Sequence, residues 1–112
     1  MSVLDKAKQH YKAKLSAEPR ALLVPEWDST VYIRPGISLQ NLGDIMELAN
    51  SGKTAEAMAQ TLIHRLVDED GKAIFRKIER AELMRSVDPD VLARIVGEIN
   101  ATDPDQDDAS GN

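Results

Sequence analysis

The chain has 112 residues, a formal net charge of −5 and no cysteine. This length suits one domain, the acidic balance argues against a protein that mainly binds nucleic acid, and the lack of cysteine excludes disulfides and thiolate metal sites. Hydrophobic residues make up 42% of the chain but aromatic residues only 4%, so we expect a largely aliphatic core. No signal peptide is visible and no apolar run reaches about 18 residues, which predicts a cytoplasmic protein without a membrane segment.

Residues 2–16 have the pattern of a helix with a narrow apolar stripe and a lysine-rich opposite face. Ser2 is placed to cap this helix, and Pro19 ends the pattern. Residues 1–20 carry five basic and two acidic side chains, 5 − 2 = +3, and we assign the basic N-terminal helix to residues 1–18 and expect it to be mobile when nothing is bound. A solvated face is the usual role of such a charge run, and docking onto another protein is the competing role. The narrow apolar stripe of this helix consists of Leu4, Ala7, Tyr11 and Leu15.

Residues 21–34 have the composition of a short β-hairpin. Two apolar stretches flank the turn residues Asp28 and Ser29, and the second stretch is β-branched and aromatic without a helical period. Pro25 suits a strand end or an edge strand, because it cannot donate to a ladder. Trp27, near the tip, has two open roles: contact with a partner protein, or packing back over the helices.

Helical periodicity dominates the chain from residue 38 onward. Residues 38–50 and 54–68 have broad apolar faces, with Ser38 and Thr54 as expected caps and Gly52 placed to end the first helix. The apolar face of the first helix comprises Leu39, Leu42, Ile45, Met46, Leu48 and Ala49.

The pattern loosens over residues 72–87, which we interpret as one or two helices. Asp88-Pro89-Asp90 then gives a strong start signal for a last helix. From residue 102 the chain is acidic and has no large apolar side chain, which predicts a disordered tail over 102–112. The predicted fold is therefore mainly α: one domain over 1–101 with about four to five helices and one short hairpin.

Two short patterns that could bind a ligand fail at specific positions. Residues 51–54 end like a phosphate-binding loop, but the motif needs a glycine where Glu47 stands, and a helix precedes it instead of a strand. Residues 68–71 suggest a calcium loop. If Asp68 is the first ligand, Ala73 occupies the position that requires glycine, and if Gly71 is the required glycine, Leu66 occupies the position of the first ligand and cannot bind the ion. A helix end and a solvated turn explain the two segments better.

The remaining residues offer no catalytic pattern. His10 and His64 are the only histidines, and neither has a partner at a metal-ligand spacing. No serine lies in a nucleophile elbow, and no carboxylate pair stands out from the charged background. We therefore predict that the chain is not an enzyme and holds no metal or cofactor, and that it works by binding another protein.

Two adjoining segments resemble a known family. Residues 23–28 (LVPEWD) and 31–35 (VYIRP) are similar to a block found in small tail assembly chaperones of long-tailed, siphovirus-type bacteriophages and prophages. The resemblance continues through residues 38–75 and includes 88–95, so it covers roughly residues 20–100. Its specificity comes from the order and spacing of these segments.

The resemblance implies a partner and a place of action. Proteins of this family bind the long, helix-rich tape-measure protein in the host cytoplasm, and keep it soluble while tail-tube subunits polymerise around it. They are absent from the mature virion and often form homo-oligomers. In many members a ribosomal frameshift yields a longer form that contacts the tail-tube protein. Binding would need no ATP, because no nucleotide site is found in this sequence.

Six residues are predicted to contact a partner protein. Tryptophan, tyrosine and arginine are typical of interface hot spots, and methionine suits an adaptable apolar contact. The broad helical faces also offer more apolar surface than one small core needs, which would suit an amphipathic helix of the partner or self-association. The predicted contacts are Trp27, Tyr32 and Arg34 in the hairpin and Met46, Met58 and Phe75 at groove edges.

Two other classes of function stay open at this point. The first is a structural tail-completion or adaptor protein of the phage particle, which would be abundant in finished virions. The second is an acidic regulator that binds a DNA-associated protein, which a gene neighbourhood without tail genes would favour.

Overall fold

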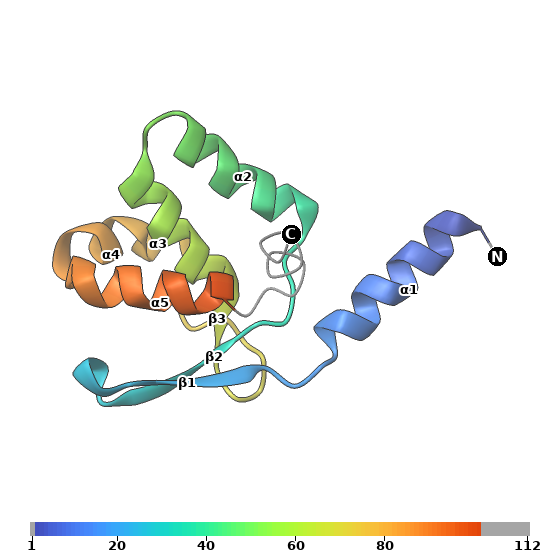
Figure 1. The fold of residues 1–112 in the computed structure, drawn as a ribbon, viewed down its shortest axis with the longest axis horizontal. Coiled ribbons are helices and arrows are strands. Elements are labelled where there is room, and N and C mark those ends of the chain that lie inside the picture. Colours follow the sequence, from blue (N-terminus) through green and yellow to red (C-terminus); the bar gives the residue numbers. More distant parts are fainter. Residues whose placement is uncertain (1, 102–112) are drawn as a thin grey trace.

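The computed structural model describes residues 2–101, so the tail predicted for 102–112 lies outside the described residues. Five α-helices and a three-stranded antiparallel sheet make up this part of the chain, which confirms the mainly α prediction (Figure 1). The helices are α1 (Val3–Leu15), α2 (Leu39–Asn50), α3 (Thr54–Arg65), α4 (Arg80–Ser86) and α5 (Pro89–Ala101), with two short 3-10 turns, η1 (Pro25–Trp27) and η2 (Lys77–Glu79). The strands are β1 (Arg20–Val24), β2 (Ser29–Ile33) and β3 (Leu66–Val67).

Polar side chains start three of the helices as predicted. At α1, the Ser2 hydroxyl accepts a hydrogen bond from the backbone N–H of Asp5 at 3.1 Å, and the Asp5 carboxylate accepts one from the Ser2 N–H at 3.4 Å. Ser38 caps α2 and Asp88 caps α5 through bonds of 3.1 and 2.9 Å. The prediction for Thr54 is wrong, because Thr54 is the first residue inside α3 and no side chain caps this helix.

Gly52 ends α2 as predicted. Its φ of +80° lies in the left-handed region that glycine adopts without strain. The Gly52 N–H donates to the carbonyl of Ala49 at 3.1 Å, and the N–H of Lys53 donates to the carbonyl of Leu48 at 2.9 Å. These two bonds reverse the chain, so that α2 packs back against α3.

The hairpin forms as predicted, with β1 and β2 paired from Arg20 opposite Ile33 to Val24 opposite Ser29. Pro25 begins the 3-10 turn at the end of β1, and Asp28 takes a φ of 48° to bring the chain into β2. Side chains alternate along β2, because successive residues of a strand point to opposite faces.

The third strand was not predicted. The sequence predicts a helix to residue 68, but α3 ends at Arg65 and the next two residues pair with Tyr32 and Ile33 of β2. Leu66 and Val67 are both fully buried. They pair with β2, and Val67 also forms a bridge to Ala73 in the 72–75 segment. The looser 72–87 segment contains η2 and the single helix α4.

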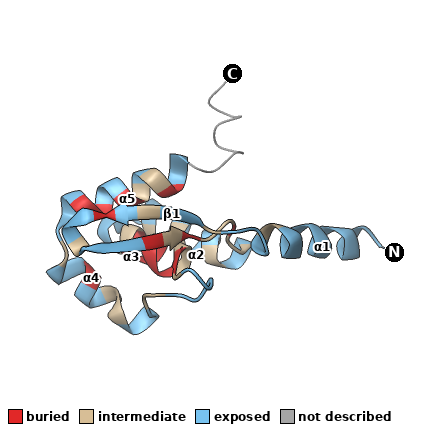
Figure 2. Ribbon diagram, turned by 90° about the horizontal axis from the view of Figure 1, so that it is seen from below, coloured by how far each residue is buried: buried red, intermediate tan, exposed pale blue. Residues whose placement is uncertain are grey.

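The main core lies between the sheet and helices α3 and α5 (Figures 1 and 2). It contains only aliphatic side chains at its centre, as expected from the composition. These are Val24, Val31, Ile33, Leu62, Leu66, Val91, Leu92, Ile95 and Ile99. A smaller cluster of Ala59, Ile63 and Leu83 joins α3 to α4.

Helix α1 lies apart from this core. It extends away from the rest of the molecule, and none of its residues is buried (Figures 1 and 2). Only its C-terminal end touches the domain, where Leu15 and Lys14 lie over Gly36. Across residues 2–101, no helix is both long and apolar enough to span a membrane.

Candidate protein-binding surfaces

The six predicted contact residues lie in three places. Trp27, Met58 and Phe75 pack around the main core. Tyr32 and Arg34 lie on and just after β2. Met46 lies on the exposed side of α2, apart from the other five predicted contacts, so the structure does not bring the six together as one groove.

Trp27 and Phe75 form an edge-to-face pair. Their ring centroids are 6.1 Å apart with an interplanar angle of 87°. Both rings are half-buried against the core, and Met58 packs against the same cluster. Of the two roles open for Trp27, packing over the helices therefore has direct structural support, while contact with a partner stays a prediction for the exposed part of the ring.

Ion pairs hold the hairpin against α5. Glu26, beside Trp27, accepts two hydrogen bonds from the guanidinium of Arg94, and Arg20 at the other end of β1 donates to Glu98 at 3.0 Å. The hydrogen bonds from Arg94 are the main cause that lowers the pKa of Glu26 to about 2. The hairpin is thus fixed to the domain at both ends of β1.

Tyr32 belongs to a face of the sheet that the helices do not cover. We call this the outer sheet face, formed by Ala21, Leu23, Thr30 and Tyr32. Tyr32 is half-buried, and it points away from the core because its neighbours Val31 and Ile33 point into it. Leu23 on β1 is 66% exposed, so the β1–β2 part of this face is in contact with solvent, whereas Val67, which pairs with Tyr32 on the same face, is 1% exposed and marks its covered end.

The backbone of Arg34 is engaged in the fold. Its N–H donates to the carbonyl of Arg65 at 2.7 Å, and its carbonyl accepts from the guanidinium of Arg65 at 3.0 and 3.3 Å. These bonds continue the β2–β3 pairing beyond the strand ends. The Arg34 side chain lies beside the segment that links α1 to β1.

Helix α2 carries an exposed apolar surface, in agreement with the expectation that the broad helical faces offer more apolar surface than the core needs. No residue of α2 is fully buried. Ile45 and Leu48 turn towards α3 and are half-buried, whereas Leu39 is 84% exposed and Met46 53% exposed. We call the exposed side the α2 stripe, formed by Leu39, Leu42 and Met46. The signal in the sequence was the width of the apolar face, which exceeds what one packing contact covers.

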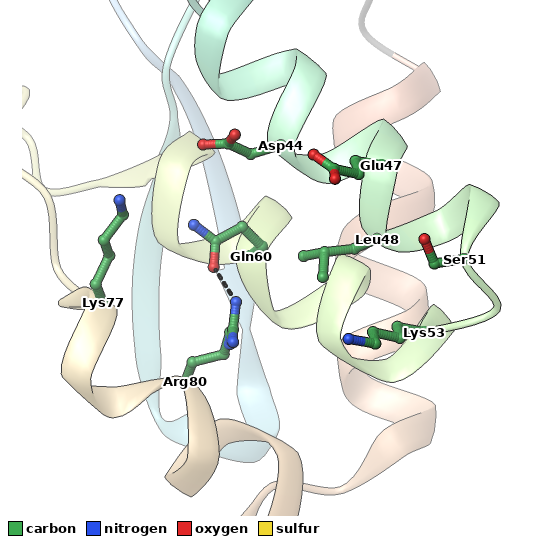
Figure 3. Close-up of a pocket in the computed structure, with 8 residues that line it drawn as sticks. All are labelled: Asp44, Glu47, Leu48, Ser51, Lys53, Gln60, Lys77 and Arg80. Atoms are coloured by element: carbon green, nitrogen blue, oxygen red, sulfur yellow. Dashed lines mark hydrogen bonds between the residues drawn. The ribbon is translucent and has the colours of Figure 1, made fainter.

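A polar cavity of about 480 Å³ lies beside α2 (Figure 3). Its lining has three basic and two acidic residues, and the Arg80 guanidinium donates to the amide oxygen of Gln60 at 3.3 Å. Gln60 lies 2.9 Å from the ring nitrogen of His64, whose pKa is lowered chiefly by burial. Such a mixed lining suits polar side chains. The charged residues are Asp44, Glu47, Lys53, Lys77 and Arg80.

The candidate ligand loops of the sequence serve as turns. The Asp68 carboxylate accepts hydrogen bonds from the backbone N–H groups of Asp70 and Lys72, both at 2.9 Å, and so closes its own turn. Within residues 2–101, no group of three or more histidine, aspartate or glutamate side chains is placed to hold a metal ion.

The architecture described above, a small helical domain on a three-stranded sheet, is shared with a phage tail assembly protein. That protein is the tail assembly chaperone of bacteriophage HK97, whose solved structure matches this chain with a TM-score of 0.63 and 22% sequence identity. The match covers 87% of this chain and 92% of the HK97 chain. No family model matches the sequence, and no curated protein matches it. The resemblance drawn from the hairpin block is thus confirmed at the level of the fold.

Proposed function

We propose that this chain is a tail assembly chaperone of a long-tailed bacteriophage or prophage. It binds the tape-measure protein in the host cytoplasm, keeps it soluble during tail-tube assembly, self-associates, and is absent from the mature virion. The observation that carries the proposal is the shared fold, which spans 92% of the HK97 chaperone. The hairpin block supports it, because residues 23–28 and 31–35 resemble the same class of chaperone in sequence.

The exposed apolar surfaces suit a helical client. A long amphipathic helix binds by placing its apolar side chains against an apolar surface of its partner. The outer sheet face offers exposed Leu23 beside Tyr32, and the α2 stripe offers a second surface on another side of the chain. We propose that the client binds to the outer sheet face, which includes Tyr32, one of the residues predicted to contact a partner.

The backbone at residues 51–54 supports binding without ATP. A phosphate-binding loop directs its free backbone N–H groups at the nucleotide. Here the N–H groups of Ser51, Gly52 and Lys53 already donate to carbonyls of α2. The segment is therefore used to end a helix, and client binding is expected to be unchanged when ATP is removed with apyrase.

Co-expression with the tape-measure protein of the same phage tests the proposal. The soluble fraction of the tape-measure protein should rise severalfold when this chain is present. An unchanged soluble fraction would show that the chain is not its chaperone. Leu23→Gln should reduce the effect, whereas Ile78→Gln should not, since Ile78 is equally large and 78% exposed but lies on η2, outside the outer sheet face.

Purified phage particles separate the proposal from the adaptor alternative. A chaperone acts before the tail is complete, so mass spectrometry of mature virions should detect no stoichiometric amount of this chain. Stoichiometric copies would instead identify it as a structural tail-completion or adaptor protein. The longer frameshifted form, which would contact the tail-tube protein, can be sought in the same infected cells by its larger mass.

A further inference from the structure

Two helices of similar length carry exposed apolar stripes. The α1 stripe is Leu4, Ala7, Tyr11 and Leu15, with spacings of three, four and four residues, and the α2 stripe has spacings of three and four. Such spacings place side chains along one seam of a helix. The helices have 13 and 12 residues, so each is roughly 20 Å long.

The two helices also carry opposite charge. Helix α1 has four lysines and one aspartate, 4 − 1 = +3, whereas α2 has Asp44 and Glu47 and no basic residue, hence −2. Lys8 and Lys14 flank the α1 stripe. On α2, Asp44 and Glu47 both line the polar cavity with basic residues of η2, α4 and the loop between α2 and α3, and Glu47, next to Met46, is the one nearer the α2 stripe. Pairing α1 with another α1 would bring the lysines of two copies together, whereas pairing α1 with the α2 stripe places them near Glu47.

Helix α1 needs such a partner more than any other element. An isolated helix of about 12–15 residues is only marginally stable in water, and helices in proteins gain most of their stability by packing. None of residues 3–15 is buried, and α1 points away from its own α2 along most of its length (Figures 1 and 2). The α2 stripe of the same copy is therefore open to the α1 of another.

We propose that α1 of one copy docks onto the α2 stripe of a second copy. This inference deepens the self-association included in the proposed function by naming the two surfaces that meet. Each copy offers one donor helix and one acceptor helix, so copies join either head to tail or as a two-fold dimer that exchanges α1 reciprocally. Both arrangements leave the outer sheet face for the client.

The test uses the purified full chain, without the tape-measure protein, in analytical ultracentrifugation. The wild-type chain should form dimers or larger species as its concentration rises, and added salt should reverse this because it screens the charge attraction. Leu4→Gln/Tyr11→Gln damages only α1, and Leu39→Gln/Met46→Gln damages only α2. Each double variant alone should be monomeric, with the circular dichroism and melting transition of a folded domain.

Mixing the two double variants is the decisive measurement. The α2 variant retains an intact α1 and the α1 variant retains an intact α2 stripe. These two surfaces can still meet once, so the mixture should form a 1:1 heterodimer and nothing larger. A monomeric wild type, a mixture that stays monomeric, or either double variant that still associates alone would overturn the proposal. Association lost on removing residues 102–112 would overturn it too, because the acidic tail would then be the partner of α1.

Two controls separate this test from that of the proposed function. Ile78→Gln should associate like the wild type, because Ile78 belongs to neither stripe. The tape-measure solubility assay is run separately with the α1 double variant. A chain that fails to self-associate but still keeps the tape-measure protein soluble would overturn only the docking proposal.

Discussion

Glu26 in the hairpin turn and Arg94 in α5 form a bidentate ion pair, with oxygen–nitrogen distances of 2.5 and 2.7 Å, across 68 residues of sequence. The pair lowers the pKa of Glu26 from 4.5 to about 2. A carboxyl with a lowered pKa stabilises the folded state above its unfolded pKa, and this contribution is lost as pH falls towards the folded pKa. The ion pair thus makes one contribution to stability that depends on pH between about 4.5 and 2.

We predict that Glu26→Gln lowers the melting temperature at pH 7 and that this deficit shrinks as pH falls from 4.5 to 2. The substitution keeps the shape of the side chain and removes its charge, so at low pH both proteins carry a neutral residue at this position. Thermal melts followed by circular dichroism across this pH range measure the difference. A deficit that stays the same at every pH would mean that the charge of Glu26 contributes nothing.

A second prediction concerns two glycines of the α2 region. Gly52→Ala should lower the free energy of unfolding by about 1–2 kcal/mol, because alanine is strained at a positive φ. Gly43→Ala inside α2 should raise it by about 0.5–1 kcal/mol, since a Cβ there meets open space and alanine favours the helix. Urea unfolding of the two variants gives both values. If both substitutions changed the free energy of unfolding by the same amount in the same direction, the conclusion that α2 ends at Gly52 would be wrong.

A matched pair of isoleucines tests where the core lies. Ile95 is 1% exposed, and Ile95→Ala should cost about 2–5 kcal/mol through lost burial and the cavity that remains. Ile78→Ala removes the same atoms from a side chain in contact with solvent, and should change stability by less than about 0.5 kcal/mol. Denaturant unfolding of both variants makes the comparison, and similar costs would refute the packing described for α5.

The aromatic pair can be followed through the only tryptophan of the chain. Phe75→Ala should shift the fluorescence emission of Trp27 to longer wavelength, because the indole ring loses its neighbour and gains contact with water. It should also remove about 0.5–1.5 kcal/mol of pair energy in addition to lost burial. An unchanged emission spectrum would mean that the two rings do not touch in solution.

Deleting residues 2–13 should leave the unfolding transition of the remaining domain unchanged to within about 0.5 kcal/mol. This part of α1 buries no residue in the domain, and Leu15 is retained over Gly36. The measurement belongs at concentrations where the wild type is monomeric, because association adds stability by mass action. A large loss of stability would show that α1 packs on its own domain.

Local chemistry explains which elements the sequence predicted. The start of α1 at Ser2, of α2 at Ser38 and of α5 at Asp88, and the end of α2 at Gly52, all depend on side chains or backbone angles within a few residues. Such interactions are visible in the sequence because both partners are neighbours.

The elements that escaped prediction depend on distant partners. Leu66 and Val67 extend the apolar pattern of α3, and only pairing with β2 makes them a strand. The apolar face of α2 predicted helix packing but not how much of that face α3 covers, so the exposure of Leu39 became evident only in the structure. The contact of Trp27 with Phe75, which lies far along the chain, likewise became evident only in the structure.

The seam between β2 and β3 has a consequence for how the chain folds. Hairpin β1–β2 closes over a few residues and can form within microseconds. Arg34 and Arg65, whose mutual hydrogen bonds extend the seam, are 31 positions apart, and closing so long a loop costs entropy before its contacts form. The pairing of β2 with β3 therefore adds to the folding barrier, and we expect substitutions of Ile33 or Leu66 to slow refolding and substitutions in α1 to leave the refolding rate unchanged.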